Sequence, residues 1–153
     1  MKNILIRGPV LSQSGYGEQA RFALRALMTK PDLYNIFLDP INWGRTGWIT
    51  NCGEERELID QLIQKTLHHS DSGGQYDASL QITIPNEWQK IAPINIGYTA
   101  GIETTKVAPA WIEKGNEMDR IIVVSNHSKD IYQKTAYTIS NKETRQVVED
   151  DFR

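Results

Sequence analysis

The sequence predicts an α/β fold, with a Rossmann-like, doubly wound and mainly parallel sheet that carries helices on both faces. Two observations predict it. Short apolar runs alternate with longer segments whose apolar residues recur at the spacing of a helix face. The clearest runs are continuous rather than alternating, which is typical of parallel strands buried on both sides. With 153 residues, the chain has the size of one ordinary domain.

The expected elements follow one another in a regular order. Residues 3–7 form the first strand. An apolar face then predicts a helix that Pro31 ends, and a second strand at 34–38 completes a β–α–β unit. The later elements are expected as a helix at 54–69, strands at 80–84 and 94–98, a helix at 109–118, a strand at 121–124 and a further helix after Ser125-Asn126. We therefore expect one Rossmann-like domain over residues 1–137 and an aperiodic polar tail over residues 138–153.

Charge and cysteine content exclude several classes of protein. The chain has 17 Lys and Arg residues against 19 Asp and Glu residues, so there is no basic field to hold a nucleic acid. The single cysteine, Cys52, forms no internal disulfide, which favours a reducing, cytoplasmic location. The first apolar run is too short for a signal peptide, and no run of about 18 apolar residues predicts a membrane span.

The most informative segment lies between the first expected strand and the first helix. Its glycines, Gly15 and Gly17, precede a helix whose first backbone N–H groups suit a phosphate or another anion. Gly15, Gly17 and Ala20 also match the spacing of the dinucleotide fingerprint, and Asp39 ends the second strand, where a ribose-binding acid belongs. However, residues 8–14 make the loop longer than the tight turn of that fingerprint. A glycine-assisted turn without a ligand is the third interpretation.

Two further polar segments follow expected strands. Glu103 lies between a strand end and a helix start, where a carboxylate serves as a base, binds sugar hydroxyls or simply caps the helix. Ser125 suits a helix cap better than a ligand contact. The sequence contains no Asp-x-Asp triplet for a metal–diphosphate, so no metal is expected. It also lacks the phosphate-binding loop of nucleotide hydrolases and the nucleophile elbow of serine hydrolases.

Taken together, three groups of segments resemble a specific enzyme family. They are residues 4–9 with 14–18, residues 98–104 with 109–111, and residues 119–126. In order and spacing they resemble the N-terminal half of retaining glycosyltransferases of the two-domain GT-B type, close to family 4. The resemblance covers residues 1–135.

The resemblance implies transfer of a hexosyl group from a nucleotide sugar to a glycan or a small-molecule acceptor, with no cofactor and no bound metal. It implies that Gly15, Tyr16 and Gly17 face the cleft near the donor phosphate or the acceptor. It further implies that Thr99 and Glu103 line the acceptor side, with Glu103 as the candidate catalytic residue. Ser125 and Asn126 would face the same cleft.

The resemblance also implies a second domain, which is missing here. Such enzymes grip the donor with two glutamates separated by seven residues, and this sequence has no such pair. The chain alone is therefore expected to be inactive, and its uncovered apolar face is expected to favour a homodimer. Two other hypotheses remain: a nicotinamide-dinucleotide-binding Rossmann domain of an oxidoreductase that uses Gly15, Gly17 and Asp39, and a non-catalytic flavodoxin-like interaction domain.

Overall fold

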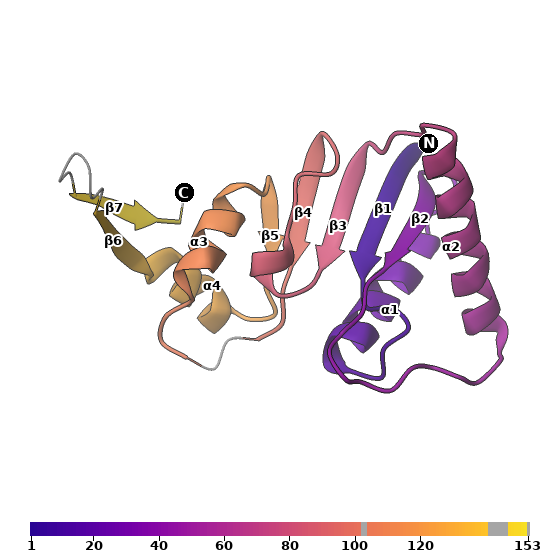
Figure 1. Ribbon diagram of the computed structural model, residues 1–153, viewed down its shortest axis with the longest axis horizontal. Coiled ribbons are helices and arrows are strands. Elements are labelled where there is room, and N and C mark those ends of the chain that lie inside the picture. Colours follow the sequence, from indigo (N-terminus) through magenta and orange to yellow (C-terminus); the bar gives the residue numbers. More distant parts are fainter. Residues whose placement is uncertain (102–103, 141–146, 153) are drawn as a thin grey trace.

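The computed structural model describes residues 1–101, 104–140 and 147–152. Figure 1 shows a twisted main sheet that is flanked by helices, and a small separate sheet formed by the last two strands. The elements in chain order are β1 (Lys2–Gly8), α1 (Gly15–Met28), β2 (Tyr34–Pro40), α2 (Glu54–Asp71), β3 (Ala78–Ile82), η1 (Pro85–Glu87), β4 (Ile94–Tyr98), α3 (Pro109–Asn116), β5 (Arg120–Ile122), α4 (Asn126–Lys134), β6 (Ala136–Ser140) and β7 (Val147–Asp151).

The main sheet has five strands in the order β2-β1-β3-β4-β5, and every neighbouring pair is parallel. This confirms the predicted fold class. The register places Ile6 of β1 opposite Leu38 of β2 on one side and Leu80 of β3 on the other. The strand order reverses between β1 and β3, and in open α/β sheets ligands bind beyond the carboxyl ends of the strands near such a point.

Different segments cover the two faces of the sheet. Helix α1 lies behind β1 and β2 in Figure 1, whereas η1 and α3 lie on the front. Trp88, which follows η1, is completely buried, and it packs so closely on Gly97 of β4 that a Cβ there would stand 2.6 Å from the indole. Since side chains alternate along a strand, the neighbouring Tyr98 faces α1 instead.

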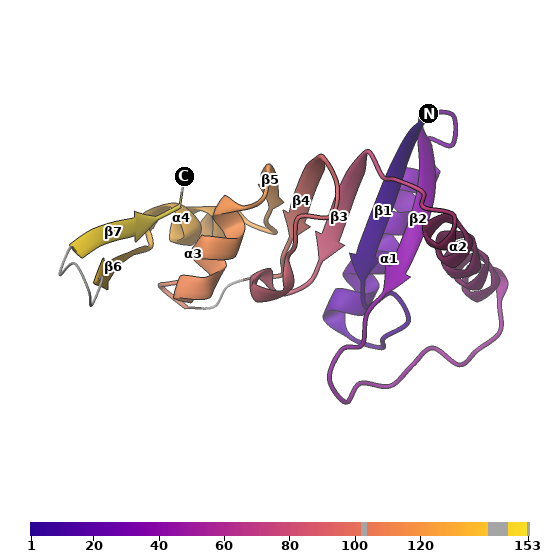
Figure 2. The same ribbon diagram turned by 45° about the horizontal axis from the view of Figure 1, so that its top comes forward.

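Helix α2 lies along the outer edge of β2, as both Figure 1 and Figure 2 show. The hydroxyl of Thr66 accepts a 2.7 Å hydrogen bond from the amide of Leu38, and Lys65 donates to the carbonyl of Ile36 at 2.9 Å. These bonds satisfy backbone groups that an edge strand would leave unpaired. Helix α2 does not cover the other edge strand of the sheet, β5.

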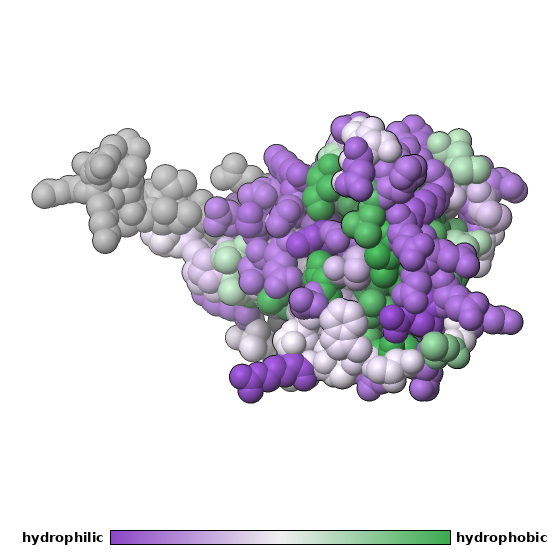
Figure 3. All heavy atoms as spheres, turned by 45° about the vertical axis from the view of Figure 1, so that its right-hand side comes forward, coloured by the Kyte–Doolittle hydropathy of each residue, from purple (hydrophilic) through white to green (hydrophobic). Residues whose placement is uncertain are grey.

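Most of the core lies between the sheet and the first two helices. Its buried members come from β1, β2, β3, α1, α2 and the loop after β1: Ile6, Val10, Leu11, Ala20, Leu24, Ile36, Leu38, Ile59, Leu62 and Ile82. On the side shown in Figure 3, hydrophobic residues form a band that hydrophilic residues border. In the described part of the chain, no helix is long and apolar enough to cross a membrane.

Two expectations about the last third of the chain need correction. The strand expected at 121–124 is only three residues long, Arg120–Ile122, and it forms the edge of the sheet. An edge strand has one neighbour, so fewer of its residues are held in a ladder. The tail that showed no periodicity contains the antiparallel pair β6 and β7, which extends away from the sheet in Figure 1.

Candidate functional site

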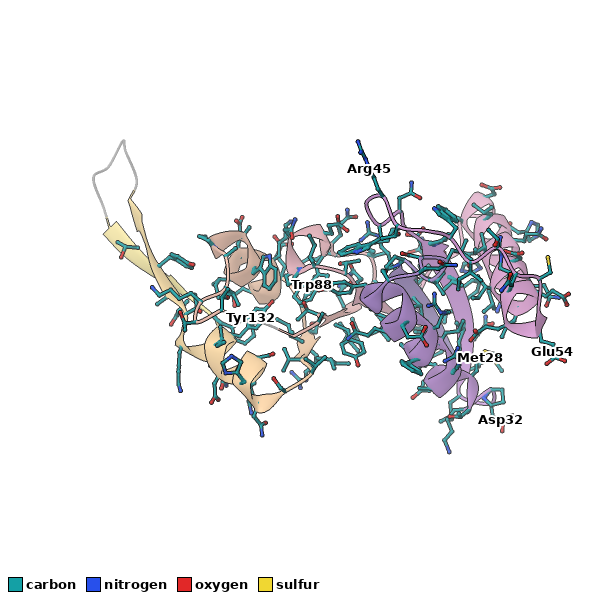
Figure 4. The ribbon with its side chains drawn as sticks, turned by 90° about the horizontal axis from the view of Figure 1, so that it is seen from below. Met28, Asp32, Arg45, Glu54, Trp88 and Tyr132 are labelled. Atoms are coloured by element: carbon teal, nitrogen blue, oxygen red, sulfur yellow. The ribbon has the colours of Figure 1, made fainter. Side chains whose placement is uncertain are left out.

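A groove of about 500 Å³ lies on the α1 side of the sheet, near the carboxyl ends of β4 and β5. Figure 4 looks onto the end of the sheet at which the strands finish. Four parts of the chain contribute to the groove: the first two turns of α1, the segment after β2, the end of β4 and the segment after β5. The residues that line it are Gly15, Tyr16, Glu18, Gln19, Phe22, Trp43, Tyr98, Ala100, Gly101 and Val124.

The start of α1 is closed on its inner side by the protein itself. The Ser14 hydroxyl accepts a 3.1 Å hydrogen bond from the amide of Gly17, and it also accepts a 2.9 Å bond from the Ser12 hydroxyl. A Cβ on Gly17 would stand 2.0 Å from the carbonyl oxygen of Ser12. Gly17 is therefore required by the packing of the loop against the helix, and its amide is not free for a ligand.

Gly15 is the opposite case. It is exposed, it lines the groove, and an added Cβ would meet no atom within 4 Å. The amides of Gly15 and Tyr16 occupy the first two positions of the helix, where no helix carbonyl can accept from them. The part of the glycine segment that can contact a ligand is thus Gly15 with Tyr16.

A buried arginine fixes the loop between β1 and α1. Arg21 is 5% exposed, and its guanidinium donates to the carbonyls of Val10 at 2.8 Å and Ser12 at 2.9 Å. The same group forms an ion pair with Glu18 at 2.7 Å. Because a buried charge is costly unless it is paired and hydrogen-bonded, this geometry holds residues 9–14 in one position.

The segment after β2 is tied to the same loop. The amide of Gln13 donates to the carbonyl of Gly47 at 2.8 Å, and the amide of Ile49 donates to the carbonyl of Leu11 at 2.9 Å. The two loops therefore form one unit at the rim of the groove.

Tyr16 connects α1 with the end of β4. Its hydroxyl is 3.0 Å from the hydroxyl of Thr99 and accepts a 3.2 Å bond from the amide of Ala100. Gln19 donates to the carbonyl of Thr99 at 3.4 Å. The ring of Tyr16 lies 4.7 Å from that of Trp43, tilted by 51°. Thr99 itself is fully buried, so it influences the groove through the position of Tyr16.

Ser125 and Asn126 are not among the described residues that line the groove. The hydroxyl of Ser125 caps α4 by accepting a 3.1 Å bond from the amide of Ser128, and Asn126 is the exposed first residue of that helix. Their neighbour Val124 does line the groove. Glu103, the candidate catalytic residue, falls outside the described residues.

Asp39 ends β2, as the dinucleotide hypothesis requires, but it faces a cation of the protein. Its carboxylate is 3.5 Å from the guanidinium of Arg7. Burial raises the pKa of Asp39, and the nearby Arg7 opposes that shift. Asp39 is not among the residues that line the groove.

The groove has little charge. Among the residues that the structure describes, Glu18 is the one charged residue that lines it, and its carboxylate faces Arg21 at 2.7 Å and Arg25 at 3.8 Å. No described lysine or arginine lines this groove. The lining therefore suits a neutral ligand better than a phosphate. This differs from the expectation that the start of α1 suits a phosphate or another anion.

The sequence analysis did not assign Trp43, Gln19 or Phe22 to the site. Two signals were present. Trp43 is a large aromatic residue in a glycine-rich segment, and Phe22 lies off the apolar face of α1 and is 58% exposed. Gln19 gave no signal, because its contact with the end of β4 exists only in the folded chain.

A second cavity, of about 300 Å³, lies between β5, α4 and Phe152. Tyr132 lines it, packs against the ring of Phe152, and has a buried hydroxyl with no hydrogen-bond partner in the described part of the chain. Burial raises the pKa of this phenol. The cavity lies beside the edge strand, where neighbouring structure is sparse.

Across residues 1–101, 104–140 and 147–152, no cluster of three or more His, Cys, Asp or Glu side chains is suited to hold a metal ion. In comparisons with protein-family models, curated proteins and solved structures, nothing matches the chain. The structure therefore establishes a Rossmann-like α/β fold with a five-stranded parallel sheet, and function must be argued from the groove.

Proposed function

We propose that this chain is the acceptor-binding N-terminal half of a GT-B type retaining glycosyltransferase, which transfers a hexosyl group from a nucleotide sugar. The observation that carries the proposal is the groove at the carboxyl ends of β4 and β5. It is lined by residues from all three groups of segments in which the sequence resembles this family. Parallel α/β sheets bind ligands at this end.

The lining of the groove supports an acceptor role. The tilted pair of Tyr16 and Trp43 offers aromatic faces to the C–H groups of a sugar ring. The amides of Gly15 and Tyr16, with the side chain of Gln19, offer hydrogen bonds to hydroxyl groups. In this proposal the nucleotide sugar is held by a second, donor-side domain, because the described residues of the lining include no cation for its phosphates.

In the transfer step, this chain holds the acceptor so that one hydroxyl faces the sugar of the donor. Glu103 is our candidate for the group that accepts the proton of that hydroxyl, since it lies in the segment between β4 and α3 in the sequence. Ser125 and Asn126, which follow β5, are candidates for the far side of the same cleft.

Two observations weigh against the dinucleotide hypothesis. The fingerprint needs a glycine whose backbone a pyrophosphate can approach closely. The space beside the Cα of Gly17 is instead occupied by the carbonyl of Ser12. The acid that would bind a ribose, Asp39, already faces Arg7. The interaction-domain hypothesis predicts a loop folded shut over the strand ends, yet an open groove lies beside the loop that Arg21 fixes.

The proposal is tested by titration of the ¹⁵N-labelled chain with methyl β-D-glucoside, a nucleotide sugar and NADH. We expect methyl β-D-glucoside to shift the amide signals of Gly15, Tyr16 and Gly101. Gly15→Leu should weaken its binding at least tenfold, because the new side chain enters the groove. Gly53→Leu is the matched control, since Gly53 also begins a helix and also has open space at its Cβ. Shifts caused only by NADH, around Asp39, would overturn the proposal.

A further inference from the structure

The chemistry of the groove points to the class of acceptor. Four of its lining residues are aromatic, namely Tyr16, Phe22, Trp43 and Tyr98, and they come from α1, the segment after β2, and β4. Phe22 is 58% exposed and Val124 is 53% exposed, although most large apolar side chains of a monomer are covered. A ligand that covers these two residues would remove apolar area from water, which favours binding.

Three residues at the start of α1 supply polar groups to the groove. Gly15, Tyr16 and Gln19 lie within the first turn and a half of α1, and the Tyr16 hydroxyl is already engaged with Thr99 and Ala100. The other described residues of the lining are Glu18, Phe22, Trp43, Tyr98, Val124 and the small residues Ala100 and Gly101. A ligand that matches this surface combines hydroxyl groups, which the start of α1 can bind, with an apolar ring.

The electrostatics of the groove disfavour an anion. Among the described residues, Glu18 carries the one formal charge of the lining, and both of its cationic partners lie outside the lining. A phosphorylated or carboxylated acceptor would approach this carboxylate, and the nearby Arg25, which lies over the ring of Phe22, is already paired with Glu18 and Glu55. The volume, about 500 Å³, is within the range of sites for small molecules.

We propose that the groove selects an uncharged, amphipathic acceptor, such as a glycoside with an aryl group. Its hydroxyl-bearing part lies at the start of α1, and its apolar ring lies across Trp43, Tyr98 and Phe22. This inference rests on the proposed acceptor-binding function and adds the class of acceptor to it.

The test compares three uncharged probes and one anion on the full chain by isothermal titration calorimetry: methyl β-D-glucoside, phenyl β-D-glucoside, phenol and glucose 6-phosphate. We expect phenyl β-D-glucoside to bind at least tenfold more tightly than methyl β-D-glucoside, and glucose 6-phosphate to bind most weakly. Trp43→Ala should abolish the preference for the phenyl group. Trp48→Ala is the matched control, because Trp48 lies in the same segment, is 50% exposed and does not line the groove.

Phe22→Ser provides a variant on an exposed position, so that the test does not depend on the folding of Trp43→Ala. It should reduce the preference for phenyl β-D-glucoside severalfold, while Leu67→Ser, on the exposed side of α2, should leave it unchanged.

Four results separate this inference from the function on which it rests. Equal binding of both glucosides overturns the apolar selection and leaves acceptor binding in place. Tightest binding of glucose 6-phosphate overturns the uncharged class. Phenol that binds as tightly as phenyl β-D-glucoside supports the apolar selection and overturns sugar recognition, whereas no binding of any probe overturns both.

Discussion

Helices α1 and α4 begin in the same way at the carboxyl end of the same sheet. Each follows a parallel strand, and each is capped by a serine in extended backbone conformation, Ser14 for α1 and Ser125 for α4. In each case the serine hydroxyl accepts a 3.1 Å bond from the amide three residues later, that of Gly17 or Ser128. Only α1, however, contributes residues to the groove.

The difference lies in the surroundings of the two caps. Helix α1 follows β1, which lies inside the sheet, and its first turns meet the loop fixed by Arg21 and the segment that carries Trp43. Helix α4 follows the edge strand β5, and its first residues, Asn126 and His127, are exposed. A helix cap is thus a local structure, whereas a groove needs neighbours from distant parts of the chain.

The largest effect is expected from the glycines of α1. Gly17→Ala should lower the free energy of unfolding by about 3 kcal/mol, because its Cβ collides with a backbone carbonyl that the loop holds in place. Gly15→Ala, two residues earlier, should change it by no more than about 0.5 kcal/mol. Urea denaturation measures both values. If the two variants are equally stable, the loop does not pack tightly on α1 and the contrast with α4 fails.

The next largest effect is expected from Arg21, the buried cation that fixes the loop before α1. Arg21→Met should cost about 2 kcal/mol, since the carbonyls of Val10 and Ser12 lose buried hydrogen bonds. Arg25→Met is the control on the same helix, because it removes exposed interactions, the ion pairs with Glu55 and Glu18 and the contact with the ring of Phe22. We expect Arg25→Met to unfold close to the wild type in urea. An equally small effect of Arg21→Met would mean that the loop is held by other contacts.

The smallest effect tests the similarity of the two caps. Ser125→Ala should lower the free energy of unfolding by about 1 kcal/mol, as is typical for the loss of a serine cap. Ser14→Ala should cost somewhat more, up to about 2 kcal/mol, because Ser12 also donates to the Ser14 hydroxyl. Thermal unfolding followed by circular dichroism compares them. A larger loss at Ser125 than at Ser14 would contradict this ranking.

The order of strands and helices was predictable because each element carries its own pattern. The strand at 94–98 and the start of the helix at 54 were predicted to the residue, since apolar runs and acidic first turns act locally. The strand at 121–124 was overestimated. Its branched residues favour a strand in any context, but its length depends on neighbouring strands, and β4 is its single partner in the sheet.

The candidate site was predictable only in part. Gly15, Tyr16 and the end of β4 were expected at a ligand cleft, and Gly15, Tyr16 and Tyr98 do line one groove. The sequence alone could not distinguish Gly15 from Gly17, because that difference is the position of the Ser12 carbonyl. Nor did it indicate that Thr99 would be buried beneath Tyr16.

By itself, the sequence determined the parallel α/β class, the serine cap at Ser125 and the segments that follow the strands, because these depend on periodicity and on side chains a few residues apart. Only the tertiary structure decided that Trp43, Phe22 and Val124 meet beside α1, and that the described part of the groove lining has one paired carboxylate and no cation. The physical reason is that the contacts forming this surface join residues more than twenty positions apart, and no local pattern encodes how such segments pack together.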